Sequence, residues 1–95
     1  MYKDKLLQII NHYGISNQLK KLNEEIYEFQ EAIMQYEFYK YGGDIDKLKK
    51  HIIEEYGDVL NVLEQFKIAL NLEDELINED RIFKLDRQLE RIKGE

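Results

Sequence analysis

The sequence contains no proline, no cysteine and no tryptophan, and it has few glycines and only two histidines. Without proline, the strongest helix breaker, long stretches of the chain are free to be helical. Without cysteine, disulfides are excluded, and we expect a reducing compartment, the cytoplasm. No apolar run approaches the roughly 20 residues that span a bilayer, and residues 1–13 lack the pattern of a signal peptide. We therefore expect no membrane partner.

Positive charge is also in short supply, with 14 Lys and Arg residues against 20 Asp and Glu residues and a net charge of −6. This balance disfavours nucleic-acid polymers as partners, because their binding depends on clustered positive charge. The 95 residues are 43% hydrophobic and contain no low-complexity tract. Such a chain is predicted to form one domain, residues 1–95, around one small core.

Apolar residues recur at steps of three and four, and strict alternation is missing, so the sequence predicts an all-α fold. We expect helices at about residues 2–13, 17–40, 46–70 and 72–93. Gly14, the Gly42-Gly43 pair and Asn71 mark the breaks between them. Short connections make successive helices antiparallel neighbours, which predicts an antiparallel four-helix bundle.

Two apolar stripes overlap on the second expected helix. The first consists of Leu19, Leu22, Ile26, Phe29, Ile33 and Tyr36. The second consists of Leu22, Glu25, Phe29, Ala32 and Tyr36. Because one acid interrupts the second stripe, Glu25 is expected to border the core.

The third expected helix has an acid inside its apolar seam. The seam is formed by Leu48, Ile52, Glu55, Val59, Val62, Phe66 and Ala69. An ionised acid at a core position is strongly unfavourable unless it is paired or bound to a metal. Glu55 is therefore the most informative anomaly in the sequence.

The same helix carries two further signals. Gly57 costs roughly 1 kcal/mol relative to alanine in a helix, and we interpret it as a place where another helix packs closely. A second apolar stripe runs along the opposite side of the helix, through Ile53, Tyr56, Leu60 and Leu63. A helix that is apolar on two sides in so small a chain predicts burial by another copy, as a homodimer or a dimer of dimers.

Acidic residues form two clusters with the same spacing. The clusters read Glu24-Glu25-x-x-Glu28 and Glu54-Glu55-x-x-Asp58. Carboxylates three residues apart share one helical face. If the third helix folds back at the paired glycines, two pairs converge, namely Glu25 with Glu28 and Glu55 with Asp58.

Converging carboxylates need a cation or protons. Like charges about 4 Å apart repel by roughly 4 kcal/mol at an effective dielectric constant of 20, so the group would bind metal or take up protons. Oxygen ligands without Cys or His favour Mg²⁺, Mn²⁺ or Ca²⁺ over zinc. Because Mg²⁺ is often completed by substrate phosphates, the cluster suggests phosphoryl chemistry.

The two histidines argue against a ferritin-like di-iron site, which uses Glu-x-x-His pairs. Neither His12 nor His51 lies three residues after an acid. His51 precedes Glu55 by one helical turn, and we interpret it as a surface histidine.

At these motifs the sequence resembles a known family. The E-E-x-x-E of residues 24–28 and the E-x-x-D of residues 55–58 look like those of the MazG-like all-α nucleoside triphosphate pyrophosphohydrolases. Gln18, Lys21 and Leu22 before the first motif and residues 54–60 around the second agree with this. The resemblance covers about residues 15–70.

The resemblance implies hydrolysis of a ribo- or deoxyribonucleoside triphosphate between the α and β phosphates, with Mg²⁺ as cofactor and Mn²⁺ as an alternative. The residues that match the family's metal ligands are Glu25, Glu28, Glu55 and Asp58. Its implied catalytic acids are Glu24, Glu25 and Glu55. Candidates for contacts with the substrate are Gln18, Lys21 and Asn61, and the candidates for the base pocket are Gln18, Asn61 and aromatic residues such as Phe29.

Two other classes of function stay open at this point. The first is a non-catalytic helical interaction or regulatory module, whose solvated acids would not respond to Mg²⁺. The second is another enzyme of the same fold, such as a phosphoribosyl-ATP pyrophosphohydrolase. The motifs do not specify the base, the sugar or the number of metal ions.

Overall fold

The structure is a computed structural model that describes residues 2–95. Its helices are α1 (Tyr2–Tyr13), α2 (Ile15–Tyr39), α3 (Ile45–Ala69) and α4 (Asp74–Lys93), and these residues form no strand. The predicted all-α fold is thus confirmed, with helix boundaries within two residues of those expected. None of these four helices combines the length and the apolar character needed to cross a membrane.

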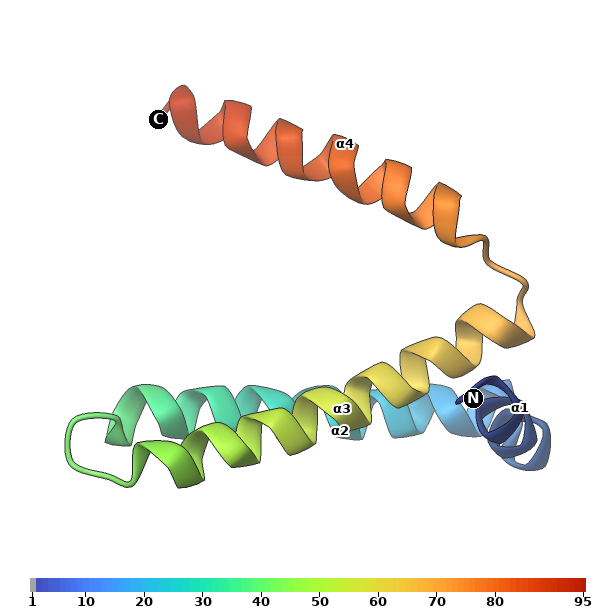
Figure 1. The fold of residues 1–95 in the computed structure, drawn as a ribbon, viewed down its shortest axis with the longest axis horizontal. Coiled ribbons are helices and arrows are strands. Elements are labelled where there is room, and N and C mark those ends of the chain that lie inside the picture. The colour runs from blue at the N-terminus through green and yellow to red at the C-terminus, as the bar shows by residue number, and fades with distance from the viewer. Residues whose placement is uncertain (1) are drawn as a thin grey trace.

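The centre of the molecule is an antiparallel pair formed by α2 and α3 (Figure 1). The connection between them passes through Gly42 and Gly43, as the sequence predicts. At the other end of the pair, α1 runs across both helices and contacts α3 and α2. The two long helices therefore hold the residues of both acidic clusters side by side.

The helix ends explain why the chain turns where it does. Asp44 caps α3, because its Oδ1 accepts a hydrogen bond from the backbone N–H of Lys47 at 3.2 Å. At the other end of α3, Asn71 adopts φ 53°, and the N–H of Leu72 donates to the carbonyl of Lys67 at 3.0 Å. This is a Schellman motif, with asparagine in the left-handed position that glycine usually takes.

The register of α2 is set by residues seven apart. Gln18, Glu25 and Ala32 are its buried side chains, and they alternate with the half-buried Leu22, Phe29 and Tyr36. The second of the two expected stripes thus faces α3. Leu19, Ile26 and Ile33 of the first stripe remain exposed.

The core is small, and polar side chains contribute much of it. Its buried apolar residues are Leu6, Ile10, Ala32 and Val62. Gln18, Glu25 and Gln65 are buried with them. On α3, every member of the predicted seam is buried or half-buried, Glu55 included.

The prediction of a four-helix bundle holds for three helices only. Within residues 2–95, α4 does not pack along another helix and projects away from the other three (Figure 1). A short connection makes neighbours only if the chain folds back, and here the turn at Asn71 is followed by an extended Glu73, with φ −78° and ψ 131°. An ion pair between Lys67 Nζ and Asp74 Oδ1, at 2.8 Å, joins α3 to the start of α4.

The interpretation of Gly57 as a close helix contact is wrong for the single chain. Apart from its chain neighbours and the backbone of its own helix, no heavy atom of the described residues lies within 4 Å of the position that a Cβ at Gly57 would take. The stripe predicted beside it is real, since Ile53, Tyr56, Leu60 and Leu63 are all exposed. The face of α3 away from α2 is therefore apolar and uncovered in one chain.

The paired glycines of the α2–α3 turn offer a matched test of this fold. A Cβ at Gly43 would lie 2.8 Å from the carbonyl oxygen of Tyr39, whereas a Cβ at Gly42 would meet nothing within 4 Å. Gly43→Ala is expected to lower the free energy of unfolding by about 1–3 kcal/mol, as overpacking does. Gly42→Ala should change it by less than about 0.5 kcal/mol. Urea unfolding of both variants measures the difference, and equal effects would contradict the turn geometry.

Candidate metal centre and adjoining cavity

Three carboxylates from two helices meet in the middle of the α2–α3 pair. Glu25 and Glu28 of α2 and Glu55 of α3 each offer an oxygen, and these oxygens lie within 4.8 Å of one another. Glu25 is only 5% exposed, whereas Glu28 is open to solvent. The predicted approach of the two acidic motifs is therefore present for these three residues.

Two of the carboxylates are incompletely satisfied. Glu25 Oε2 and Glu55 Oε2 are buried and have no hydrogen-bond partner in the described part of the chain. A buried anionic oxygen without a partner costs free energy, so native proteins rarely leave one. A divalent cation between the helices would satisfy both atoms, and a donor set made only of carboxylate oxygens suits a hard cation such as Mg²⁺.

Burial and crowding act together on Glu55. Desolvation raises the pKa of its carboxyl group, and the charges of Glu28 and Asp58 raise it further. His51 opposes this shift, since its Nε2 lies 3.4 Å from Glu55 Oε1. His51, interpreted from the sequence as a surface residue, is therefore a neighbour of the cluster.

Asp58 lies at the edge of the cluster. Its side chain is exposed, and it does not belong to the group of three whose oxygens lie within 4.8 Å. Partial desolvation of its carboxyl group and the nearby charge of Glu25 raise the pKa of Asp58, while Lys21 lowers it. Asp58 thus adjoins the buried Glu25 without sharing the tightest part of the site.

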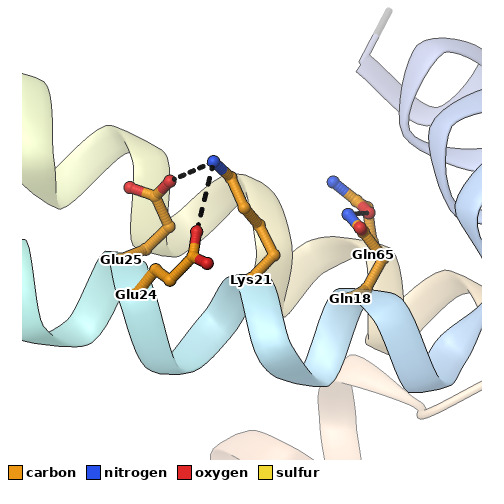
Figure 2. Close-up of polar contacts among 5 residues, drawn as sticks. All are labelled: Gln18, Lys21, Glu24, Glu25 and Gln65. Atoms are coloured by element: carbon orange, nitrogen blue, oxygen red, sulfur yellow. Dashed lines mark hydrogen bonds and ion pairs between the residues drawn. The ribbon is translucent and has the colours of Figure 1, made fainter.

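Lys21 places a positive charge at the cluster. Its Nζ lies 3.0 Å from Glu25 Oε1 and 3.9 Å from Glu24 Oε2 (Figure 2). The hydrogen bond and the charge of Glu25 raise the pKa of Lys21. The ammonium group occupies one oxygen of Glu25 and leaves the second without a partner.

A cavity of about 510 Å³ opens beside the cluster. It is lined by Ile9, Tyr13, Asn17, Gln18, Lys20, Lys21, Glu24, Glu25, Asp58, Asn61, Val62 and Gln65. All three residues expected from the sequence to contact a substrate, Gln18, Lys21 and Asn61, are among them. Phe29 does not line the cavity; its ring packs edge-on against Tyr56, with centroids 5.9 Å apart.

Gln65 is a residue of the site that the sequence pattern did not reveal. It is 3% exposed, and its Oε1 accepts a hydrogen bond of 2.7 Å from Nε2 of Gln18. In the sequence, only its spacing of three residues from the seam residue Val62 hinted at burial; the structure adds that its helix contacts both α1 and α2. A helix that packs against two other helices buries residues on more of its circumference than a single apolar seam covers, and Gln65 lies in this additional part.

Comparison of the chain with protein-family models, with curated proteins and with solved structures finds no match. The family resemblance therefore rests on the two acidic motifs and the residues around them.

The raised pKa of Glu55 and Asp58 predicts how stability depends on pH in the absence of metal. A carboxyl group whose pKa is raised by folding binds more protons when folded, so its contribution to stability falls as pH rises from the ordinary pKa through the raised one. The chain with EDTA should therefore unfold at a higher temperature at pH 5 than at pH 7.5.

Removing one of the crowded charges should have the same effect at neutral pH. Without metal, Glu55→Gln is expected to raise the free energy of unfolding, because it removes a repulsion of roughly 1–4 kcal/mol. The increase should be near the lower end of this range, since Glu28 is exposed and water screens the repulsion. It should also flatten the pH dependence. Glu37→Gln, an exposed change further along α2, is the control. A loss of stability in Glu55→Gln alone would show that the carboxylate is not under strain.

Proposed function

We propose that the chain is a Mg²⁺-dependent nucleoside triphosphate pyrophosphohydrolase. It would add one water across the anhydride between the α and β phosphates and release a nucleoside monophosphate and pyrophosphate. Mn²⁺ is the alternative cofactor. The observation that carries the proposal is a group of three carboxylates with two unsatisfied buried oxygens, set against a cavity large enough for a small molecule.

The residues divide into those that would hold the cation and those that would face the substrate. Glu25, Glu28 and Glu55 would bind Mg²⁺, with Asp58 beside them as the fourth acid of the motif. Bound Mg²⁺ would neutralise charge on the phosphates and make a water easier to deprotonate. Glu24, exposed and lining the cavity, would accept the proton of that water.

Lys21 and Asn61 would contact the phosphates and the sugar from the wall of the cavity. Lys21 is tied to Glu25 by an ion pair, and a divalent cation at Glu25 would compete with it. The ammonium group of Lys21 would then be free to contact a phosphate oxygen. Binding of the metal would thus be coupled to binding of the substrate.

Pyrophosphate release tests the proposal directly. The chain should release pyrophosphate from ribo- or deoxyribonucleoside triphosphates with Mg²⁺, and Glu25→Gln should lower the rate at least about 100-fold, since even partners outside the ligand shell cost 10–100-fold. Glu37→Gln, exposed on the same helix, should keep the full rate.

The outcomes separate the alternatives. Release of pyrophosphate from phosphoribosyl-ATP alone would identify the chain as a phosphoribosyl-ATP pyrophosphohydrolase. A thermal shift with Mg²⁺ but no release from any of these substrates would contradict hydrolysis. The absence of both would favour the interaction module.

We also propose that two copies of the chain complete the bundle that one copy leaves open. The accessible surface is 8054 Å², about 2,200 Å² more than the roughly 5,800 Å² expected for a compact 11.5 kDa monomer. The radius of gyration is 16.8 Å, against about 12 Å for a compact chain of this length. Burying this excess on each of two copies gives an interface of the size found in obligate homodimers.

The surfaces available for such a contact are apolar on both sides. On α4 an uncovered stripe is formed by Ile82, Leu85, Leu89 and Ile92. On α2 and α3 the exposed apolar rows, including Ile26 and Leu60, turn to the side of the pair away from Lys21 and Asn61, because each residue advances a helix by about 100°. Docking on this side would leave the cavity open to substrate.

Light scattering after size exclusion should give a mass twice that of the chain, or four times for a dimer of dimers. Leu60→Glu should shift the mass toward that of one chain, because it places a charge in the apolar row. Tyr41→Glu, equally drastic but in the α2–α3 turn, should not change the assembly. A monomeric mass for the unaltered chain at 100 μM would refute the dimer.

A further inference from the structure

The polar pair at one end of the cavity has no role in the proposed cation site. Gln18 of α2 and Gln65 of α3 are 6% and 3% exposed, and a single hydrogen bond of 2.7 Å joins their amides. An amide offers two donor hydrogens and an acceptor oxygen, so one bond leaves much of each group unsatisfied. Two amides in so small a core cost free energy unless they have further partners.

The free atoms of this pair open into the cavity. Gln18 Oε1 and Gln65 Nε2 make no other hydrogen bond in residues 2–95. The buried atoms without a partner are Glu25 Oε2 and Glu55 Oε2, so the two free amide atoms are not fully buried. Gln18 and Gln65 line the cavity, and we place their free atoms at its surface. The pair therefore presents one acceptor and one donor to whatever enters.

The position of the pair fits one end of an elongated ligand. Gln18 precedes Glu25 by seven residues on α2, and Gln65 follows Asp58 by seven on α3, so two helical turns, about 10 Å, separate amides from acids on each helix. Figure 2 shows Lys21 between the amide pair and the two acids Glu24 and Glu25. Ile9, Tyr13 and Val62 add apolar surface to the cavity.

We infer that the Gln18–Gln65 pair recognises the hydrogen-bonding edge of a nucleobase, and that Gln65 is a specificity-determining residue. The inference rests on the proposed function, because a nucleoside triphosphate with its phosphates at the carboxylates would extend its base toward these amides. Each common base offers an adjacent donor and acceptor on its Watson–Crick edge, which proteins read with such polar groups. The ring of Tyr13, at the same cavity, provides an apolar surface for the base.

The pair also explains how one site would accept different bases. Rotation of both amides by a half-turn keeps their mutual hydrogen bond and exchanges which of them presents the donor. One arrangement matches the keto bases guanine, thymine and uracil, and the other matches the amino bases adenine and cytosine. The site is therefore expected to bind uridine and adenosine with affinities within about tenfold of each other.

The test uses nucleosides without phosphates and without Mg²⁺, so it is independent of hydrolysis. Uridine and adenosine are titrated into the ¹⁵N-labelled chain, and the side-chain amide signals of Gln18 and Gln65 are followed by NMR. Saturable shifts of these signals are expected, and ribose should not cause them. Gln65→Met, close in size but without polar hydrogens, should weaken binding at least tenfold, while Gln30→Met, an exposed change on α2, should not.

The outcomes distinguish recognition from packing. Unchanged nucleoside binding in Gln65→Met, or no saturable shift in the unaltered chain, would overturn the inference. If Gln65→Met does not fold, Gln65→Asn keeps the amide but withdraws it by one methylene, and it should weaken binding in the same direction. Binding of nucleosides by a chain that releases no pyrophosphate would sustain the inference and refute the proposed activity. Binding of only one of the two nucleosides would refute the exchange of donor and acceptor.

Discussion

The structure depends on the carboxyl side chains that α2 and α3 enclose between them. Glu25 and Glu55 lie where two helices pack, and burial makes their charges costly unless they are paired, protonated or bound to a cation. Lys21 meets one oxygen of Glu25, and His51 approaches one oxygen of Glu55. The second oxygen of each has no partner in the described chain. The protein thus provides a partner for one oxygen of each carboxylate, and a divalent cation is the simplest group that would interact with the other.

The same helix pair separates two surfaces with different uses. Seven-residue spacing on α2 turns Gln18, Glu25 and Ala32 toward α3, and this register places the polar residues of both helices around one cavity. Leu19, Ile26 and Ile33 are turned outward as a result. A core in which Gln18, Glu25 and Gln65 occupy buried positions has given up apolar contacts that would stabilise it, as functional sites commonly do. The exposed apolar rows and α4 are the surfaces through which we propose that a second copy restores that stability.

Much of this arrangement follows from the sequence, because it is local. Helix boundaries follow from glycine, asparagine and aspartate at the turns, and the seam position of Glu55 predicted its partial burial. The matching acidic motifs on either side of the paired glycines predicted its approach to Glu25. What could not be predicted depends on contacts between segments. The sequence offers two stripes on α2, and the more apolar one, with Leu19, is not the one that faces α3; only packing against α3 decides this. Gln65 looks like a solvated residue until α1 covers its side of α3, and the direction of α4 depends on the backbone after Asn71.

The most direct test of the central claim is the position of a bound metal. A crystal of the chain grown with Mn²⁺ would give an anomalous-scattering map in which the ion stands out from every light atom. A peak is expected between α2 and α3, within about 2.2 Å of oxygens from Glu25, Glu28 and Glu55, the distance at which carboxylates bind such small divalent ions. A map at saturating Mn²⁺ with no peak at these carboxylates, while Lys21 still holds Glu25, would contradict the claim that their crowding exists to bind a cation.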